Sequence, residues 1–219
     1  MPFHIQNPIF SGITDTEFKE MQDLGCIRTK TYPKNTPVFY TGDLTKELGL
    51  VLSGRVTIEN IDLWGNRNIL SDIAPGHAFA ETYALANLPL MVDAITSEES
   101  QILLVNVKDL LTDRYAQTSW QPKLIRNLLL LTTRKNLTLS SRIFCTAPKK
   151  IRPRVLIYLS NCSVQYGSPE FDIPFDRQEL ADYLNLDRTA LSKELAKMKA
   201  DGLIDYQKNH FVLYATNLF

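Results

Sequence analysis

The sequence predicts an α+β chain with three consecutive parts: an N-terminal antiparallel β-roll of the jelly-roll kind, a long helix, and a C-terminal winged helix-turn-helix. Three observations support this order. Short apolar runs between Gly, Pro and Asn fill the first half, a leucine-rich stripe follows Trp120, and two capped helical segments precede a short hairpin near the end. With 219 residues, the chain can form two modest domains with cores of their own.

The first half has the pattern of a roll. Frequent short strands between turn residues are typical of an antiparallel barrel or roll. Gly54 and Gly76 stand where tight turns are needed, and Trp64-Gly65-Asn66 has the composition of a hairpin tip. A short helical segment is expected near residues 15–24, followed by strand-length apolar runs at 38–40, 50–52, 55–58, 68–73, 91–96 and 101–105.

Residues 119–145 are predicted to form the long helix. Lys or Arg interrupts every heptad register before the end, so a simple coiled coil is not predicted over the full length. A second copy of the chain or the roll itself could bury the apolar stripe, and both can do so on different faces. We expect Leu124, Leu128 and Leu131 to form a dimer interface. The stripe consists of Leu124, Ile125, Leu128, Leu129 and Leu131.

Two short helices with a tight turn between them are predicted near the end of the chain. Asp176 can cap the first helix, and Glu179 completes a capping box. Asn185 breaks the pattern, Asp187 opens the second helix and Gly202 ends it. Helices joined by so short a turn cross steeply, as in a helix-turn-helix. The expected inward faces are Leu180, Ala181 and Leu184, then Ala190, Leu191, Leu195 and Met198.

The outer face of the second helix carries hydrogen-bond donors of the kind that read base edges or hold phosphates. Two short alternating runs around Lys208-Asn209 follow and predict a wing-like hairpin. An ordinary helical hairpin with a solvated face is the alternative. The caps, the basic face and the hairpin together favour double-stranded DNA as the first partner. The outward donors are Arg188, Thr189, Ser192, Lys193 and Lys197.

The formal net charge of zero hides an asymmetry along the chain. From Arg114 to Pro169 there is no Asp or Glu, and between Asn68 and Val107 there is no Lys or Arg. This separation suits an acid-rich sensing part and a basic nucleic-acid part. A solvated basic helix would give a similar pattern.

The remaining composition points to a cytoplasmic protein without a cofactor. The N-terminus lacks the form of a signal peptide, and no apolar run approaches a membrane span, so no membrane contact is expected. Cys26, Cys145 and Cys162 lack metal-site spacing and are interpreted as packing residues, with a redox-sensing thiol as the alternative. His77 lies beside a Pro-Gly turn, where an exposed turn residue is expected and a haem ligand is the alternative.

An enzyme is not expected. Rolls of this kind resemble the barrels of metal-dependent enzymes, but such sites need two or three His with a carboxylate, and the roll offers one His. A nucleophile elbow, a phosphate loop and a zincin helix are absent from the sequence. We therefore assign no catalytic residue and no metal ligand. A ligand-binding or scaffolding dimer that does not bind DNA is the other alternative.

Taken in order, these parts resemble the Crp/Fnr superfamily of bacterial transcription regulators. The resemblance implies a homodimer on a palindromic operator, with RNA polymerase as a candidate partner. It implies a sensory roll at 1–118, a dimerisation helix at 119–145 and a DNA-binding domain at 146–219. The motifs that carry it are Leu52-Ser-Gly-Arg-Val56, Ile73-Ala-Pro-Gly-His-Ala-Phe-Ala-Glu81, Arg177-Gln-Glu-Leu-Ala181, Asp187-Arg-Thr-Ala-Leu-Ser-Lys193 and Asp201-Gly-Leu-Ile204.

The resemblance also implies which residues face DNA. Thr189 stands where several relatives carry Glu, so we expect a different half-site preference. The expected base-contacting residues are Arg188, Thr189, Ser192 and Lys193, and the expected phosphate contacts are Arg177, Gln178, Lys197, Lys199 and Lys208.

The sensor departs from the family pattern. Relatives that bind cyclic nucleotides use Phe-Gly-Glu followed by an Arg-Ser or Arg-Thr pair that holds the cyclic phosphate, whereas this chain has Phe79-Ala80-Glu81 and no cation at 87–92. Burying a phosphate there without a cation would cost several kcal/mol, which argues against a cyclic nucleotide. The cysteine set of the iron–sulfur branches is also missing. We expect an unidentified small-molecule effector in an apolar pocket near Phe79, Glu81, Leu88 and Met91, or no ligand at all.

Two prolines separate the long helix from the DNA-binding part. Pro148 and Pro153 place a hinge for signal transmission at residues 145–153. A rigid corner is the alternative.

Overall fold

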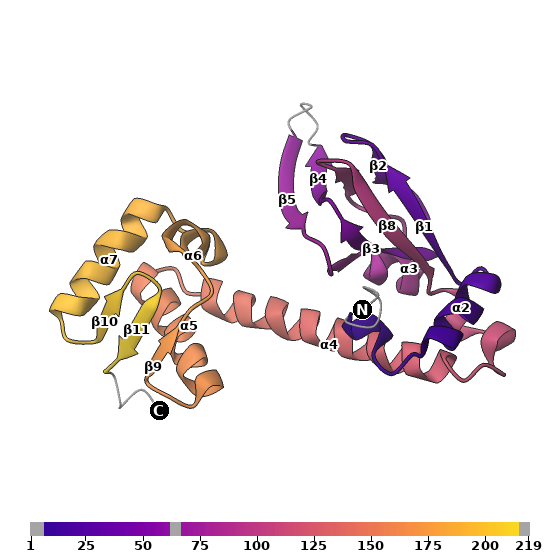
Figure 1. Cartoon of the computed structure of the whole chain (residues 1–219). Coiled ribbons are helices and arrows are strands. Elements are labelled where there is room, and N and C mark those ends of the chain that lie inside the picture. The colour runs from indigo at the N-terminus through magenta and orange to yellow at the C-terminus, as the bar shows by residue number, and fades with distance from the viewer. Residues whose placement is uncertain (1–6, 62–66, 215–219) are drawn as a thin grey trace. The chain divides into compact units, whose positions relative to one another are not determined.

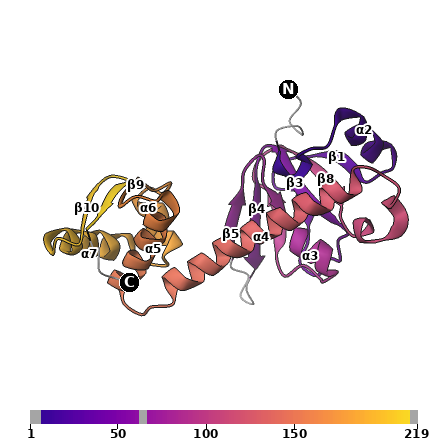
Figure 2. The same ribbon diagram turned by 90° about the horizontal axis from the view of Figure 1, so that it is seen from below.

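The computed structural model describes residues 7–61 and 67–214, so the Trp64-Gly65-Asn66 tip lies outside the described residues. The chain divides into two compact units, Met1–Thr132 and Thr133–Phe219, and the boundary falls inside the long helix α4 (Gln121–Thr146). The predicted α+β class, with antiparallel sheets, a long helix and a helix-turn-helix, is confirmed (Figures 1 and 2).

The first unit is a roll of two four-stranded sheets (Figure 1). Every strand pair in it is antiparallel. One sheet has the order β1 (Ile27–Tyr32), β8 (Ser100–Asn106), β3 (Glu47–Ser53) and β6 (Ala78–Phe79). The other has the order β2 (Pro37–Phe39), β7 (Asp93–Thr96), β4 (Val56–Ile61) and β5 (Arg67–Ile73).

The roll interior is filled by side chains from both sheets. Phe79 lies across Gly49 and leaves no room there for a Cβ, and its ring centroid lies 5.9 Å from that of Phe39. Gly54 and Gly76 have φ of +79° and +86°, which confirms the predicted tight turns. The cluster comprises Tyr32, Phe39, Val51, Val56, Phe79, Leu90, Ala94, Ile102 and Leu104.

Short helices and turns complete this unit. They are η1 (Pro8–Phe10), α2 (Asp15–Asp23), α3 (Glu81–Ala86), η2 (Asp109–Leu111) and η3 (Asp113–Tyr115). The predicted helix near 15–24 is confirmed, and Thr14 caps it through a capping box with Glu17.

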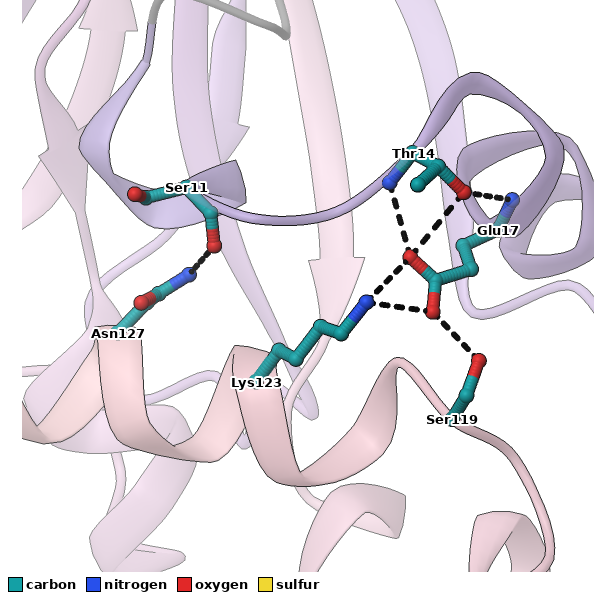
Figure 3. A network of polar contacts seen from close by, with 6 residues as sticks. All are labelled: Ser11, Thr14, Glu17, Ser119, Lys123 and Asn127. Atoms are coloured by element: carbon teal, nitrogen blue, oxygen red, sulfur yellow. Dashed lines mark hydrogen bonds and ion pairs between the residues drawn. The ribbon is translucent and has the colours of Figure 1, made fainter.

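The carboxylate of Glu17 fastens α2 to the start of α4 (Figure 3). Lys123 donates to both of its oxygens at 2.8 Å, and Ser119 Oγ donates at 2.5 Å. The backbone N–H of Thr14 donates a further bond at 2.8 Å. The hydrogen bond from Lys123 contributes most to lowering the pKa of Glu17 to about 2.

The first turns of α4 belong to the core of the same unit. Asn127 donates to the carbonyls of Ile9 and Ser11 at 2.9 and 2.8 Å, and Leu124 and Leu128 are 0% and 4% exposed in one cluster with the N-terminal segment. This corrects the expectation that these leucines lie mainly at a subunit contact. Packing against the roll unit, the alternative weighed from the sequence, buries both side chains.

The exposed face of α4 carries a different apolar set. Leu131 is only partly buried. The large apolar side chains of α4 that are exposed are Leu129, Leu130, Leu137, Leu139, Ile143 and Phe144.

Over the residues that the structure describes, the second unit combines the end of α4 with three further helices and a small sheet. The further helices are α5 (Ile151–Tyr166), α6 (Arg177–Tyr183) and α7 (Arg188–Ala200). Its antiparallel sheet has the order β10 (Ile204–Gln207), β11 (His210–Leu213) and β9 (Glu170–Asp172). Residues 147–150 connect α4 to α5, and Pro153 lies in the first turn of α5, where proline is tolerated. Within the described ranges, no helix is both long and apolar enough to cross a bilayer.

Candidate nucleic-acid interface

The predicted helix-turn-helix is formed by α6 and α7. The Asp176 Oδ1 accepts the Glu179 N–H at 2.8 Å, and the Glu179 Oε2 accepts the Asp176 N–H at 2.7 Å, which confirms the capping box. Asp187 caps α7 by accepting the Ala190 N–H at 2.8 Å. Gly202, with φ of +70°, follows the C-cap residue Asp201 at the end of α7. The fully buried residues are Leu180, Ala181, Leu184, Leu191, Leu195 and Met198.

Asn185 makes the turn between the two helices. Its φ is +53°, and the N–H groups of Asn185 and Leu186 donate to the carbonyls of Asp182 and Ala181 at 3.2 and 2.9 Å. This is the αL termination that asparagine tolerates better than most residues. The turn fixes the point from which α7 departs.

The outer face of α7 presents the expected base-contacting residues. Arg188, Thr189 and Lys193 are exposed, whereas Ser192 is half-buried and donates to the Arg188 carbonyl at 2.9 Å. The small Ala196 continues the exposed face beyond Lys193. Such a face combines long donors with a stretch that can approach a groove closely.

The expected phosphate contacts fall into two groups. Lys197 and Lys208 are exposed, and Gln178 is exposed although it donates to Asp182 Oδ1 at 2.9 Å. Lys208, at the tip of the wing, has φ of +56°. These three side chains lie on the surface, where a phosphate can reach them.

Arg177 and Lys199 are held by contacts within the protein. The guanidinium of Arg177 lies over the rings of Tyr206 and Phe211 at 5.1 and 5.8 Å, and burial lowers its pKa. Lys199 pairs with Asp205, and this hydrogen bond raises the pKa of the lysine. Both side chains attach a helix to the wing, a role that the sequence did not indicate.

A cleft of about 580 Å³ lies between the start of α6 and the wing turn. Arg177, Lys208 and Asn209 contribute to its lining, together with Asp176 and Glu179. Both carboxylates already accept N–H groups in the capping box. The cleft is therefore of mixed polarity rather than a purely cationic groove.

Several arginines of the long basic stretch hold the second unit together. Arg152 bridges Glu194 and Asp201 at 2.6 and 2.7 Å. Arg142 and Arg154 donate to backbone carbonyls at the end of α6. The expectation that this basic stretch belongs to a nucleic-acid-binding part therefore does not extend to these three arginines, which bond to groups within the protein.

The residues expected to line an effector pocket do not form one enclosed lining. Phe79 and Glu81 are buried, at 3% and 5% exposure, but Leu88 and Met91 are 56% and 72% exposed. The Phe79 ring is part of the packed roll interior.

The structure brings one cation to this region that the sequence did not indicate. Lys108 follows β8, and its Nζ donates to Asn87 Oδ1 at 2.6 Å in an exposed contact. This contact could not be predicted from the sequence, because it depends on how the roll brings the two segments together. The turn itself holds Ala80 at φ +63°, immediately before α3.

The three cysteines are buried and not joined to one another. Burial raises the pKa of Cys26 to about 12 and also raises the pKa values of Cys145 and Cys162. Raised values disfavour the thiolate, which is the reactive form. His77 is exposed, as expected for a turn residue.

Two family models match the chain. A cyclic nucleotide-binding domain matches residues 29–112, and a Crp-like helix-turn-helix domain matches residues 153–216.

Curated relatives extend over both domains. The cyclic AMP receptor protein of Thermus thermophilus is 27% identical over 90% of this chain and 88% of its own length. The nitrogen fixation regulation protein FixK of Rhizobium meliloti is 25% identical over 80% and 76%. A CRP-like cAMP-activated global transcriptional regulator of Mycobacterium tuberculosis is 25% identical over 79% and 78%.

Solved structures show the same fold. CprK in complex with OCPA has a TM-score of 0.59 at 15% identity and covers 89% of both chains. A c-di-GMP-responsive global regulator of Xanthomonas campestris has a TM-score of 0.51 at 22% identity, covering 92% of this chain and 100% of that one.

Proposed function

Because the chain is a Crp/Fnr-type transcription regulator with a helix-turn-helix DNA-binding domain, we propose that it binds a palindromic operator as a homodimer. We propose further that a signal sensed by the β-roll changes its affinity for DNA. The observation that carries the proposal is the exposed donor face of α7 on a capped helix-turn-helix with a wing. Its site of action would be the cytoplasm, with RNA polymerase as a candidate partner and no enzymatic role.

The roles of individual residues follow from their exposure. Arg188, Thr189 and Lys193 are proposed to contact bases, with Ser192 beside them. The proposed phosphate contacts that are exposed on the surface are Gln178, Lys197 and Lys208. Arg177 and Lys199 already make contacts within the protein. They are proposed to contact DNA phosphates only through the atoms of their side chains that remain exposed to solvent.

The dimer contact is proposed for the exposed face of α4. Leu130, Leu137 and Phe144 are all exposed and recur every seven residues, so they lie along one stripe of α4. Covering these side chains with a second copy would remove apolar surface that the single chain leaves in water. Two helix-turn-helix units would then meet half-sites about one DNA turn apart, roughly 34–36 Å.

The effector is proposed not to be a cyclic nucleotide. Residues 68–107 contain no Lys or Arg, and the Phe79 ring is packed inside the roll. Lys108 reaches Asn87 in an exposed contact, so it does not place a cation in that interior cluster. Calorimetric titration with cyclic AMP and cyclic GMP should show no binding at physiological concentrations, and a dissociation constant in the low micromolar range would refute this.

Binding-site selection from a randomised duplex pool tests the function itself. The wild-type protein should enrich a two-fold symmetric sequence with half-sites one helical turn apart. A pool that stays random would instead favour a ligand-binding or scaffolding dimer without DNA binding.

A further inference from the structure

The end of α6 raises the question of what satisfies its carbonyl groups. The last four carbonyls of a helix have no donor within the helix, and they need partners from elsewhere. The turn supplies donors for two of these carbonyls, since the N–H groups of Leu186 and Asn185 donate to the carbonyls of Ala181 and Asp182. The carbonyls that follow receive their donors from two arginines on other helices.

Arg142, in the last turns of α4, donates hydrogen bonds to carbonyl groups at the end of α6. Its Nε donates to the Tyr183 carbonyl and its Nη2 to the Asp182 carbonyl, both at 3.2 Å. The guanidinium also lies 5.9 Å from the Tyr183 ring centroid. Cys145, one turn further along α4, is fully buried in the core of the second unit, which holds this part of α4 in place.

Arg154, on α5, donates hydrogen bonds to carbonyl groups of the turn between α6 and α7. Its Nη1 donates to the carbonyls of Leu184 and Asn185 at 3.1 and 3.0 Å, and its Nε donates to the Pro148 carbonyl at 2.6 Å. Pro148 lies in the segment between α4 and α5. One guanidinium therefore ties the interhelical turn to the connection from α4.

We propose that Arg142 and Arg154 are positioning residues for base reading, which hold the carbonyl groups of residues 182–185 and thereby fix where α7 begins. This inference rests on the proposed DNA-binding function. It takes both arginines out of the set of phosphate contacts, where a count of basic residues would place them.

The chemistry favours arginine in both places. A planar guanidinium offers several N–H donors in a fixed fork, so it can bond two neighbouring carbonyls at once. A positive charge at the C-terminal end of a helix is also stabilised by the helix dipole. Lysine keeps the charge but not the fork, so Arg142→Lys separates positioning from charge.

The experiment compares variants on two duplexes of equal length, the operator selected with wild type and an unrelated sequence. Affinities are measured across a salt series for wild type, Arg142→Gln, Arg142→Lys and Arg154→Lys. Lys149→Gln is the matched control, because it removes one exposed charge from the connecting segment without touching a carbonyl of α6. Thermal unfolding of each variant is recorded under the same conditions.

We expect both Arg142 variants and Arg154→Lys to lose affinity for the operator by roughly tenfold. Affinity for the unrelated duplex and the slope of affinity against salt should stay near the wild-type values, because no phosphate contact is lost. Since Arg142 is exposed, its variants should remain folded at the assay temperature. Arg154→Lys provides an independent test on a second helix.

Different results would overturn the inference. If Arg142→Gln lowers the salt slope by about 0.9 and weakens both duplexes equally, Arg142 contacts a phosphate directly. If Arg142→Lys and Arg154→Lys bind like wild type, the fork geometry is irrelevant. If the wild-type protein itself does not distinguish the two duplexes, the proposed DNA-binding function fails. That outcome differs from a failure of the inference, in which wild type distinguishes the duplexes and only the variants deviate from expectation.

Discussion

Ala80 and Lys208 have backbone angles that glycine adopts most easily, with φ of +63° and +56°. A side chain at such an angle costs roughly 1–2 kcal/mol, because its Cβ crowds the following carbonyl oxygen. Lys208 lies at the proposed DNA surface, whereas Ala80 lies at the turn where relatives that bind cyclic nucleotides carry glycine. Neither angle could be predicted from residue type, since alanine and lysine both favour negative φ.

Ala80→Gly should therefore stabilise the first unit. The relief of the left-handed strain outweighs the greater backbone entropy of glycine in the unfolded chain, leaving a gain of about 0.5–1 kcal/mol. Urea unfolding measures the change. Ala86→Gly, at the exposed last residue of α3, is the control and should bring no gain in stability. If Ala80→Gly brings no more stability than the control, Ala80 is not strained.

Glu17 gives a prediction with a defined pH range. Its pKa is lowered to about 2 in the folded protein, against about 4.3 in an unfolded chain. The group therefore stabilises the fold above the unfolded pKa, and this contribution is lost as the pH falls from about 5 towards 2.

Glu17→Gln should cost roughly 1–3 kcal/mol at pH 7, because Lys123 and Ser119 lose a charged acceptor. The variant should also lose less stability than wild type on acidification. Denaturant unfolding at pH 7 and pH 4 measures both effects. Glu20→Gln, on the exposed side of the same helix, should change neither the stability at pH 7 nor its loss on acidification. If the two glutamine variants behave alike, the network in Figure 3 does not stabilise the unit.

At the scale of elements, the helix-turn-helix was the most predictable part because its signals are local. Caps, a turn residue and a terminal glycine each act within a few residues. By contrast, β1 was missed because its four central residues are all exposed, so the strand shows no apolar alternation. β9 is only three residues long and exists through its pairing with β11.

The site was predictable as a list of exposed residue types but not as a set of contacts. The sequence identifies Arg177 and Lys199 as cations on the DNA-binding part. It cannot show that one lies over Tyr206 and Phe211, or that the other pairs with Asp205. These partners come from other elements, and their distances are set by tertiary packing. The burial of Leu124 and Leu128 was ambiguous for the same reason.

The two apolar faces of α4 predict different outcomes for two similar substitutions. Leu137→Glu should leave the fold intact but give a monomer at micromolar concentration, because a carboxylate in an apolar seam is costly. Leu128→Glu buries the same carboxylate in the core and should destabilise the first unit by several kcal/mol. Light scattering and thermal unfolding separate the two effects. A stable Leu137→Glu dimer would exclude this face from the interface.

At the scale of the whole molecule, the proposed dimer would double the effect of each proposed reading residue on one operator. Arg188→Ala should cost roughly 1–3 kcal/mol per half-site and flatten the preference at one position of each. Lys197→Ala should weaken all sequences alike and lower the salt slope by about 1 for each charge removed. Repeating the selection with both variants distinguishes these roles. If the Arg188 variant selects an unchanged motif while the lysine variant alters it, the assignment of reader and anchor is reversed.

The buried cysteines give each unit its own chemical label. Cys26 lies in the core of the first unit, and Cys145 and Cys162 lie in the core of the second. A thiol reagent can modify such a side chain only after the surrounding core opens, and the rate then reports the free energy of that opening. Peptide mapping after partial modification would therefore reveal which unit opens first. Because these labels are native, the same measurement with DNA present would show whether DNA slows the opening of either core.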